Sequence, residues 1–410
     1  MLVIVQNLSV PFDRRVWLEC LALVSDGHTV DVICPNDRNE PRFEVRQGVR
    51  IHRYHPAPPT STTKDFVVEF AYSWCRTAAL AGWIALRHGI DVVQACNPPD
   101  TYFVLGAAAR LTGRRFVFDH HDLSPELFRS RFGDAGPDTA TAVDAERGSR
   151  TGSGTDALAL RGLLWLERMT FRTANVVIAT NESYRRVALT RGGCDPDDVT
   201  VVRSGPDLDR VRRCAPRPDL RAGHELLCCY LGVMGPQDGV DLAVEAVDII
   251  VHDLGRTDCH FAFIGAGDSY YEVRALASDS GLDEWVTFTG RVPDEIVFAY
   301  LSTADVGLCP DPLNPLNDLS TMNKTMEYMA FGIPVVAFDL VETRVTAGRA
   351  AVYAPPNRVG VFAKELDALL GDAPRRRQMG ALGRHRVEAE LAWANQREAY
   401  LGVYRSLAER

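Results

Sequence analysis

The 410-residue sequence has no paired CxxC motif, no basic excess and no long apolar run. Its ten cysteines are scattered, and no His-x-x-x-His motif stands near them, so the spacing that zinc ligation normally needs is missing. Several cysteines stand in or beside apolar strand-like runs, where free thiols behave as small hydrophobic groups: Cys34, Cys228, Cys229 and Cys309. We therefore expect reduced, structural cysteines in a cytoplasmic protein.

Basic side chains are outnumbered, because 45 Lys and Arg against 54 Asp and Glu give a net charge of −9. A nucleic-acid-binding protein needs a basic surface that neutralises phosphates, so no nucleic-acid partner is expected. Residues 2–5 are too short for a signal-peptide core, and no uncharged apolar run reaches the roughly 18 residues of a membrane span. These absences predict a soluble protein.

Short apolar runs alternate with amphipathic stretches, a pattern typical of parallel sheets built from βαβ units. Asp13 is expected to cap the first helix and Gly27 to end it. Two series of strands are predicted: residues 2–5, 29–34, 91–94, 115–118 and 175–179, then 226–231, 260–264, 286–288, 305–308 and 334–338. We therefore predict an α/β protein of two Rossmann-like, doubly wound domains. Their expected bounds are 1–205 and 206–389, with a last helix in 390–410 packing back on the first domain, and the prolines of 204–223 mark the junction.

Residues 133–155 are rich in small and polar residues and lack apolar periodicity, so a flexible surface loop is expected there. The role of this loop is left open: it is a mobile lid, a loop that binds the acceptor, or a tolerated surface insertion. The helix predicted at 158–174 carries Arg161, Arg168 and Arg172 beside apolar side chains. We favour a core-packed helix with a charged outer face, and contact with an anionic membrane surface is the alternative.

Ligands of open α/β sheets bind beyond the carboxyl ends of strands, near a topological switch. Gly265-Ala266-Gly267 follows one predicted strand and is short enough for backbone N–H groups to approach a phosphate at the next helix. Gly232 and Gly235 follow another strand in the same way. The two turns together predict a cradle for a diphosphate.

A helix beginning near Ser320 would place Asn323 and Glu327 one turn apart on one face, with Lys324 beside them. The carboxylate of Glu327 could accept two hydrogen bonds from a ribose diol, and the helix N-terminus could bind phosphate or sugar oxygens. An exposed Lys–Glu pair on a solvated face is the alternative. We prefer a binding role, because strand signals flank this helix.

His120 and His121 compete for one role within the run Asp119-His120-His121-Asp122. An imidazole near a leaving diphosphate could hydrogen-bond the transferring sugar or stabilise developing charge, and a neighbouring carboxylate could fix its tautomer. Metal binding is disfavoured because no other His or Cys lies near in sequence. Two Asp-x-Asp strings, at 195–197 and 207–209, stand in turn-like sequence and are discounted as metal–nucleotide sites.

With these residues the chain resembles the retaining glycosyltransferases of family four, which adopt the GT-B fold of two facing Rossmann-like domains. The resemblance covers nearly the whole chain and is carried by residues 7–19, 91–97, 119–122, 232–239, 288–293 and 323–336. It implies transfer of a sugar from a nucleotide diphosphate sugar, a UDP-sugar first and a GDP-sugar second, to an acceptor hydroxyl with retained configuration. No metal or other cofactor is implied. The first domain would bind the acceptor and the second the donor.

The resemblance matches His121, with Asp122 beside it, to the active-site histidine and Glu327 to the second glutamate of a Glu-x7-Glu motif. The candidate catalytic residues are therefore His121, Asp122 and Glu327. The candidate donor-binding residues are Gly232, Gly235, Gly265, Gly267, Arg291, Asp318, Asn323, Lys324 and Glu327, with Arg15 and Arg203 as phosphate candidates.

Three features depart from the family pattern. Leu319 stands where the motif has its first glutamate, and Asp318, one step away, is expected to substitute. The Arg and Lys that clamp the diphosphate fall near Val233 and Asp238, in a loop without positive charge, and the first-domain loop has residues 11–15 in place of the usual Gly-Gly pair. Compensation of the phosphate charge is therefore expected from Lys324, which we link to Glu327, ahead of Arg15, Arg203 and Arg291.

The acceptor is left open among a saccharide, a lipid-linked sugar and a small-molecule aglycone. Cytoplasmic location, with contact at the inner face of the membrane, is the matching expectation. Two alternatives to a transferase are a nucleotide-sugar epimerase or phosphorylase on the same fold and a non-catalytic GT-B partner protein. The missing clamp residues are the feature that favours the last of these.

Overall fold

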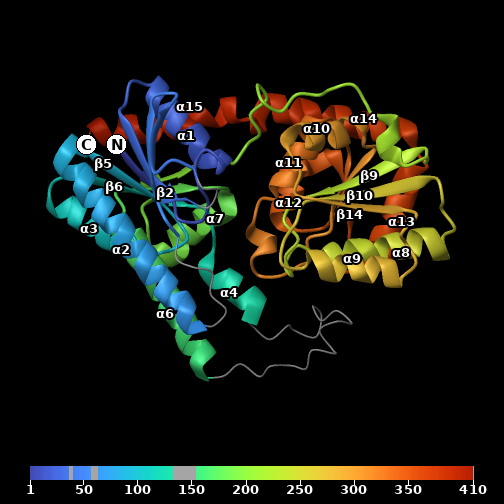
Figure 1. Cartoon of the computed structure of the whole chain (residues 1–410), viewed down its shortest axis with the longest axis horizontal. Helices are drawn as coiled ribbons and strands as arrows, with labels where there is room; N and C mark the ends of the chain where they lie inside the picture. The colour runs from blue at the N-terminus through green and yellow to red at the C-terminus, as the bar shows by residue number, and fades with distance from the viewer. Residues whose placement is uncertain (37–39, 57–62, 133–153, 410) are drawn as a thin grey trace. The chain divides into compact units, whose positions relative to one another are not determined.

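The computed structural model describes residues 1–36, 40–56, 63–132 and 154–409. It divides into two compact units (Figure 1). Unit 1 holds residues 1–127, 154–204 and 396–410, and unit 2 holds residues 205–395 together with the end of helix α4 from Phe128. The division at 204/205 falls one residue from the expected junction. Residues 133–153 of the expected flexible loop lie outside the described residues, and Gly154 and Thr155 belong to helix α6.

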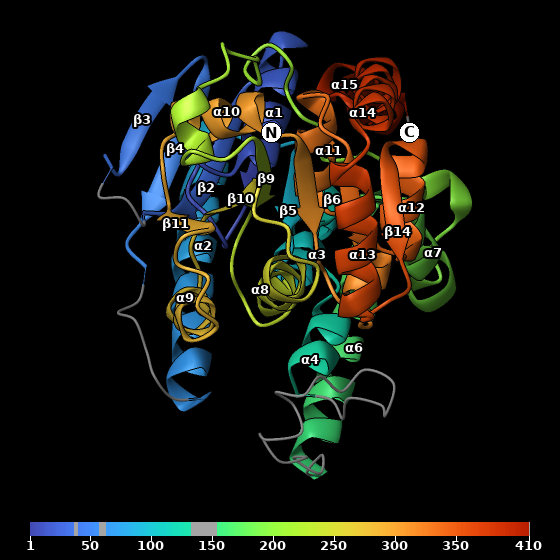
Figure 2. The same cartoon turned by 90° about the vertical axis from the view of Figure 1, so that its right-hand side faces the viewer.

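Unit 1 is built on an eight-stranded sheet with the order β3-β4-β2-β1-β5-β6-β7-β8. Its strands are β1 (Leu2–Ile4), β2 (Val30–Pro35), β3 (Phe43–Arg46), β4 (Val49–Tyr54), β5 (Val92–Cys96), β6 (Arg115–His120), β7 (Val176–Ala179) and β8 (Val199–Val201). All neighbours pair in parallel except β3, which runs antiparallel to β4 at one edge (Figure 2). The order reverses at β1, so β1 and β5 flank the topological switch.

Helices cover both faces of this sheet. They are α1 (Arg14–Ser25), α2 (Thr63–His88), α3 (Phe103–Leu111), α4 (Ser124–Phe132), α6 (Gly154–Thr173), α7 (Glu182–Val187) and α15 (Trp393–Glu409). As expected, Asp13 caps α1, accepting from the N–H of Val16, and Gly27 follows with a φ of +89°. The last helix, α15, packs on unit 1 through Tyr400 and Tyr404.

Unit 2 has a six-stranded parallel sheet of order β11-β10-β9-β12-β13-β14. Its strands are β9 (Leu226–Leu231), β10 (Cys259–Ile264), β11 (Val286–Gly290), β12 (Val306–Cys309), β13 (Val335–Phe338) and β14 (Ala351–Ala354). Its helices are α8 (Val240–Asp248), α9 (Tyr270–Asp279), α10 (Asp294–Thr303), α11 (Asn323–Ala330), α12 (Val341–Ala347), α13 (Val359–Leu370) and α14 (Ala373–Arg386). One apolar core lies under α8, α9 and α13, and a second lies under α10, α11 and α12 (Figure 1).

The predicted class of two doubly wound α/β domains is confirmed. The ten cysteines are all free, and most of them are buried as small apolar groups. Among the described residues, no helix combines the length and the hydropathy that a membrane crossing requires.

Candidate active site

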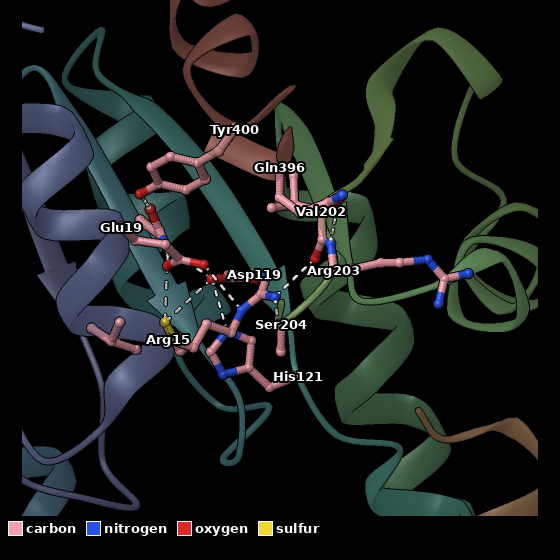
Figure 3. A network of polar contacts seen from close by, with 12 residues as sticks. Arg15, Glu19, Asp119, His121, Val202, Arg203, Ser204, Gln396 and Tyr400 are labelled. Carbon is pink, nitrogen blue, oxygen red and sulfur yellow. Dashed lines mark hydrogen bonds and ion pairs between the residues drawn. The ribbon is translucent and has the colours of Figure 1, made fainter. Parts of the chain in front are cut away.

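A buried polar cluster in unit 1 surrounds His121, just beyond the end of β6 (Figure 3). Arg15 of α1 donates from Nε to Nε2 of His121 at 2.9 Å and from Nη2 to Oδ1 of Asp119 at 3.0 Å. Its Nη1 donates to the carbonyl oxygen of Val202 and to the hydroxyl of Ser204 at 2.8 and 3.0 Å. The Arg15 side chain is only 9% exposed, so its contacts are internal to unit 1.

The charges of this cluster are strongly coupled. Burial alone would lower the pKa of Arg15, but the carboxyl groups of Asp119 and Glu19 raise it above its ordinary value. Burial would raise the pKa of Asp119, but Arg15 and His121 hold it below its usual range. Burial and the neighbouring Asp119 raise the pKa of Glu19 well above the usual carboxyl value. The pKa values of the two carboxyl groups are thus shifted in opposite directions by their surroundings.

The cluster also has the composition of a cation site. Ligand-type atoms of Glu19, Cys96, Asp119 and His121 all lie within 4.8 Å of one another. However, the guanidinium of Arg15 already contacts Glu19 at 3.0 Å, Asp119 at 3.0 Å and His121 at 2.9 Å. The positive charge at these atoms is thus supplied by Arg15, and it opposes a metal ion there. Independence from metal stays a prediction.

Asn97, which follows β5, holds the turn that carries His121. Its Oδ1 accepts from the backbone N–H groups of His121 and Asp122 at 2.6 and 3.1 Å. Its Nδ2 donates to the carbonyl oxygen of Asp122 at 2.6 Å and to Oδ1 of Asp100 at 3.1 Å. Asp100 accepts in turn from the hydroxyl of Ser124 at the start of α4. This arrangement leaves the Asp122 side chain half-buried beside His121, and burial raises the pKa of that carboxyl.

His120 has no part in this cluster. Its ring lies against the rings of Phe118, Phe171 and Tyr184, with centroids 5.1 to 5.2 Å apart. It is fully buried, and burial lowers its pKa to about 3. Since β6 extends through His120, alternation along the strand sends the two imidazoles in different directions. Of the two candidates, only His121 is placed for chemistry.

The two arginines expected to meet phosphate have different surroundings. Arg15 has its guanidinium directed to acceptors of unit 1 and organises the His121 cluster, and a phosphate contact by Arg15 stays a prediction. The backbone N–H of Arg203 donates to Oε1 of Gln396 at 3.1 Å, and its side chain points away from the cluster (Figure 3). A phosphate contact by Arg203 stays a prediction.

In unit 2, the two glycine turns lie against each other beyond β9 and β10. Gly232 and Gly265 have φ angles of +155° and +139°, which favour glycine. A Cβ atom on Gly265 would lie 1.8 Å from the carbonyl oxygen of Gly232, and one on Gly267 would lie 2.6 Å from that of Met234. The two turns can approach each other this closely only because Gly265 and Gly267 have no Cβ atom.

Lys324 of α11 reaches this pair of turns. Its Cε lies 3.3 Å from the point where a Cβ of Gly232 would stand, and its Nζ lies 4.8 Å from the ring centroid of Tyr230. Nζ donates to Oδ1 of Asp311 at 2.7 Å, and both side chains are buried. Burial alone would lower the pKa of Lys324, but Asp311 raises it well above its ordinary value. The partner of Lys324 is therefore Asp311, which corrects the expected link with Glu327.

Helix α11 begins at Asn323 and not near Ser320. Asn323 is exposed and Glu327, one turn later, is half-buried. Asp318 accepts from the backbone N–H of Val341 at 3.0 Å, at the start of α12. The donor-binding roles of Asn323, Glu327 and Asp318 stay predictions.

The loop after β9 is held by an acid where the family has a basic clamp. The N–H of Gly235 donates to Oδ2 of Asp238 at 2.8 Å, and Val233 is exposed. Arg291 is exposed directly after β11, and its contact with a donor stays a prediction.

Sequence reasoning missed Asp311, Glu19 and Gln94. The signal for the last was a polar residue in the centre of a buried strand.

Two family models match the chain. The model described as Glycosyltransferase Family 4 matches residues 13–210, and the model described as Glycosyl transferases group 1 matches residues 225–372. They fall on the two successive sheets.

Curated relatives share about a quarter to a third of aligned residues. Alpha-maltose-1-phosphate synthase of Mycolicibacterium smegmatis is 29% identical over 265 residues, which are 60% of this chain and 66% of that protein. The GDP-mannose-dependent alpha-(1-6)-phosphatidylinositol monomannoside mannosyltransferase of Mycobacterium tuberculosis is 26% identical over 335 residues, 77% of this chain and 82% of that protein. In several other relatives the chain spans only about half to two thirds of the length, between 53% and 63%.

Among solved structures, sucrose-phosphate synthase from Thermosynechococcus elongatus superposes with a TM-score of 0.75. The match covers 100% of this chain and 98% of that chain at 20% sequence identity. At this identity the likeness is one of fold.

Proposed function

This chain belongs to the family 4 glycosyltransferases with the GT-B fold, and we propose on that premise that it transfers a sugar from a nucleotide diphosphate sugar to an acceptor hydroxyl. In this proposal unit 2 binds the donor and unit 1 contributes His121 and the acceptor site.

The observation that carries the proposal is the cradle of unit 2. Gly232 and Gly265 hold two turns at the carboxyl ends of two central strands, where open α/β sheets bind ligands. Their own N–H groups donate to the carbonyl oxygens of Ile264 and Gly290 at 3.0 and 3.1 Å, so the N–H groups proposed to meet a phosphate are those of the residues that follow them in the turns. Lys324 brings an ammonium group to the same turns. A diphosphate needs this combination, because a phosphate placed away from water must be compensated by cations and N–H donors. Glu327, one turn after Lys324 on α11, is then the group for the donor ribose.

In unit 1, His121 is the candidate for contact with the transferring sugar. Its Nε2 lies 2.9 Å from Nε of Arg15 and 2.8 Å from Oδ2 of Asp119. It accepts from Arg15 or donates to Asp119 according to the tautomer, and either bond fixes the position of the ring in the cluster. A fixed imidazole can hydrogen-bond the sugar or stabilise charge that develops on the leaving diphosphate. Asp122, beside it, is proposed to contact the acceptor hydroxyl.

The finer features are proposed as follows. The donor is a UDP-sugar, with a GDP-sugar as the competing choice because one relative is named as GDP-mannose-dependent. Transfer proceeds with retention and without metal. The acceptor is a saccharide, a lipid-linked sugar or a small aglycone, and relatives named for inositol phosphate and phosphatidylinositol mannoside widen this set to inositol-type acceptors.

Helix α6 packs on unit 1 through the buried Glu167, Thr170 and Phe171, in line with the favoured expectation of a core-packed helix. We also propose that the protein works in the cytoplasm, with the exposed face of α6 as its contact to the inner face of a membrane. On this helix Leu158 and Trp165 are 71% and 56% exposed, and Arg161 and Arg168 are exposed beside them. Apolar and basic side chains on one exposed helix suit an anionic lipid surface.

Calorimetric titration with UDP, GDP and dTDP, each with and without a chelator, tests the donor site. We expect one diphosphate to bind, unaffected by the chelator. Lys324→Ala should weaken this binding by about 10–100-fold, as a hydrogen bond to a charged group is worth about 1.5–3 kcal/mol. The corresponding nucleoside should lose much less affinity.

Lys364→Ala is the matched control, because Lys364 is exposed on α13 and should leave binding unchanged. If no diphosphate binds, the chain is a non-catalytic member of the family and the proposal fails. The anomeric configuration of the product, read by NMR, then decides between retention and inversion.

A further inference from the structure

The polar cluster around His121 continues through Gln94 to the C-terminal helix α15. Figure 3 shows Tyr400 of α15 close to Glu19. The hydroxyl groups of Tyr400 and Tyr404 both donate to Oε1 of Gln94, the former at 2.8 Å. All three side chains are buried. Two donors on Oε1 fix the orientation of the Gln94 amide, because Nε2 must then face the opposite way.

The amide nitrogen of Gln94 holds the two carboxyl groups together. It donates to Oε2 of Glu19 and to Oδ2 of Asp119, both at 2.8 Å. The Gln94 amide therefore brings the carboxyl groups of Glu19 and Asp119 close to each other, within reach of one shared proton. The same Oδ2 of Asp119 lies 2.8 Å from Nε2 of His121. A continuous chain of contacts therefore leads from α15 to the imidazole.

Counting charges shows that this cluster needs one additional proton. Arg15 contributes one positive charge, and two ionised carboxylates beside a neutral His121 would leave a buried net charge of −1. Neutrality requires one proton on the carboxyl pair or on the imidazole. The other ionisable groups that face the cluster are Asp13 from α1, Cys96 from β5, Asp122 from the turn after β6, and Tyr400 and Tyr404 from α15. None of them supplies a further positive charge.

We infer that Glu19, Gln94 and Tyr400 are positioning residues for His121, and that Glu19 and Asp119 share one proton. This inference rests on the proposed function, in which His121 contacts the transferring sugar. With the proton held between the two carboxyl groups, the pair carries one negative charge, which the guanidinium of Arg15 balances. The oxygen of Asp119 that faces His121 is then held in one position by the amide of Gln94.

The carboxyl proton is tested first by infrared spectroscopy, which needs no substrate. We expect the wild-type protein at neutral pH to show a protonated-carboxyl band that shifts in D₂O and is absent from Glu19→Gln. The amide of Glu19→Gln can donate to Asp119 and accept from Gln94, just as the protonated acid does. The absence of a difference band between the two proteins would overturn the inference.

Kinetics then tests the positioning role. Glu19→Gln should keep kcat within about twofold, whereas Glu19→Leu, which cannot bond Asp119, should lower kcat about tenfold or more with an unchanged donor KM, because small displacements of a catalytic group are costly. Equal losses in the two variants, or wild-type kcat in folded Glu19→Leu, would contradict the inference. If the wild type neither binds a donor nor turns over, the proposed function fails, while the infrared band still decides whether the proton is shared.

The double variant Tyr400→Phe/Tyr404→Phe tests the connection to α15. It should change the ¹⁵N chemical shifts of the His121 ring, because the Gln94 amide is then free to rotate. Tyr353→Phe is the control, since that hydroxyl donates to the carbonyl oxygen of Gly348 in unit 2. Unchanged His121 shifts in the folded double variant would show that α15 has no such role.

Discussion

The ion pair of Lys324 and Asp311 gives the sharpest prediction about unit 2. Both side chains are buried, at 9% and 1% exposure, and they meet at 2.7 Å. Lys324→Met keeps most of the side-chain volume but takes the ammonium group from the Asp311 carboxylate, to which the thiol of Cys309 still donates at 3.0 Å. Removing one partner of a buried pair costs about 3–5 kcal/mol. For a unit of about 200 residues, each kcal/mol lowers the melting temperature by about 2–4 °C, so a fall of about 6–20 °C is expected.

Scanning calorimetry measures this change, and a double-mutant cycle isolates the pair. In Lys324→Met/Asp311→Leu no charge remains buried, so stability should return to near that of the wild type. Lys364→Met, on the exposed face of α13, should shift the transition by no more than about 1–2 °C. If Lys324→Met melts like this control, the carboxylate of Asp311 is not a buried charge and the reasoning is refuted.

The same pair predicts an opposite effect on ligand binding. In the free protein, Asp311 competes with phosphate for the Lys324 ammonium group. Asp311→Asn should therefore lower stability and, at the same time, tighten the binding of the nucleoside diphosphate about tenfold, equivalent to about 1.4 kcal/mol. Titration calorimetry at a temperature where both proteins are folded measures it. Weaker binding by Asp311→Asn would mean that the carboxylate orients Lys324 for the donor instead of competing with it.

Further predictions concern other parts of the two units. Gly265→Ala should abolish diphosphate binding, since the new Cβ would lie 1.8 Å from the Gly232 carbonyl oxygen; unchanged titration heats would contradict this. Burial lowers the pKa of His120 to about 3, so between pH 6.5 and 3 the unfolded chain binds a proton that the folded chain does not, and stability falls as pH falls. His120→Phe should therefore lose less melting temperature between pH 7 and 4 than the wild type, and equal losses would exclude the histidine as the cause. Asn97→Leu removes the three hydrogen bonds that hold the His121 turn and should lower kcat about tenfold with the fold intact by circular dichroism, whereas an unchanged kcat would show that the turn keeps its position without them.

The sequence predicted most of the strands that consist of apolar residues, together with the edge strand β11, in which threonines alternate with apolar residues. It missed β3, β4, β8 and β14, for different physical reasons. β3 is an edge strand with an exposed Phe43, and β4 alternates apolar residues with Arg50 and His52. In the structure, Arg50 and His52 both bond the buried Asp31 of β2, so their polarity is satisfied inside the fold. A sequence shows the polarity of a residue but not the partner that permits its burial.

The same limit, that a sequence does not show the partner of a polar residue, explains which parts of the candidate sites were predicted and which were not. The glycine turns and His121 follow strand ends, so local sequence located them. The partner of Lys324 was misjudged, because helix spacing points to Glu327, three residues later, whereas Asp311 comes 13 residues earlier, after β12. Helix α11 begins at Asn323, so Lys324 lies in its first turn, where a side chain reaches back towards the strand ends.

The two clusters differ in charge balance, and that difference bears on their roles. In unit 1, Arg15 faces two carboxyl groups and His121, so the cluster is balanced only with an added proton and then carries no net charge. In unit 2, one ammonium group meets one carboxylate, and an arriving diphosphate must share Lys324 with Asp311. Donor affinity then depends on backbone N–H groups of the glycine turns more than on side-chain cations, which fits a loop that has Asp238 in the place of a basic clamp. Neutral N–H donors are insensitive to ionic strength, so we infer that donor binding in this chain is less weakened by salt than binding by an arginine–lysine clamp would be.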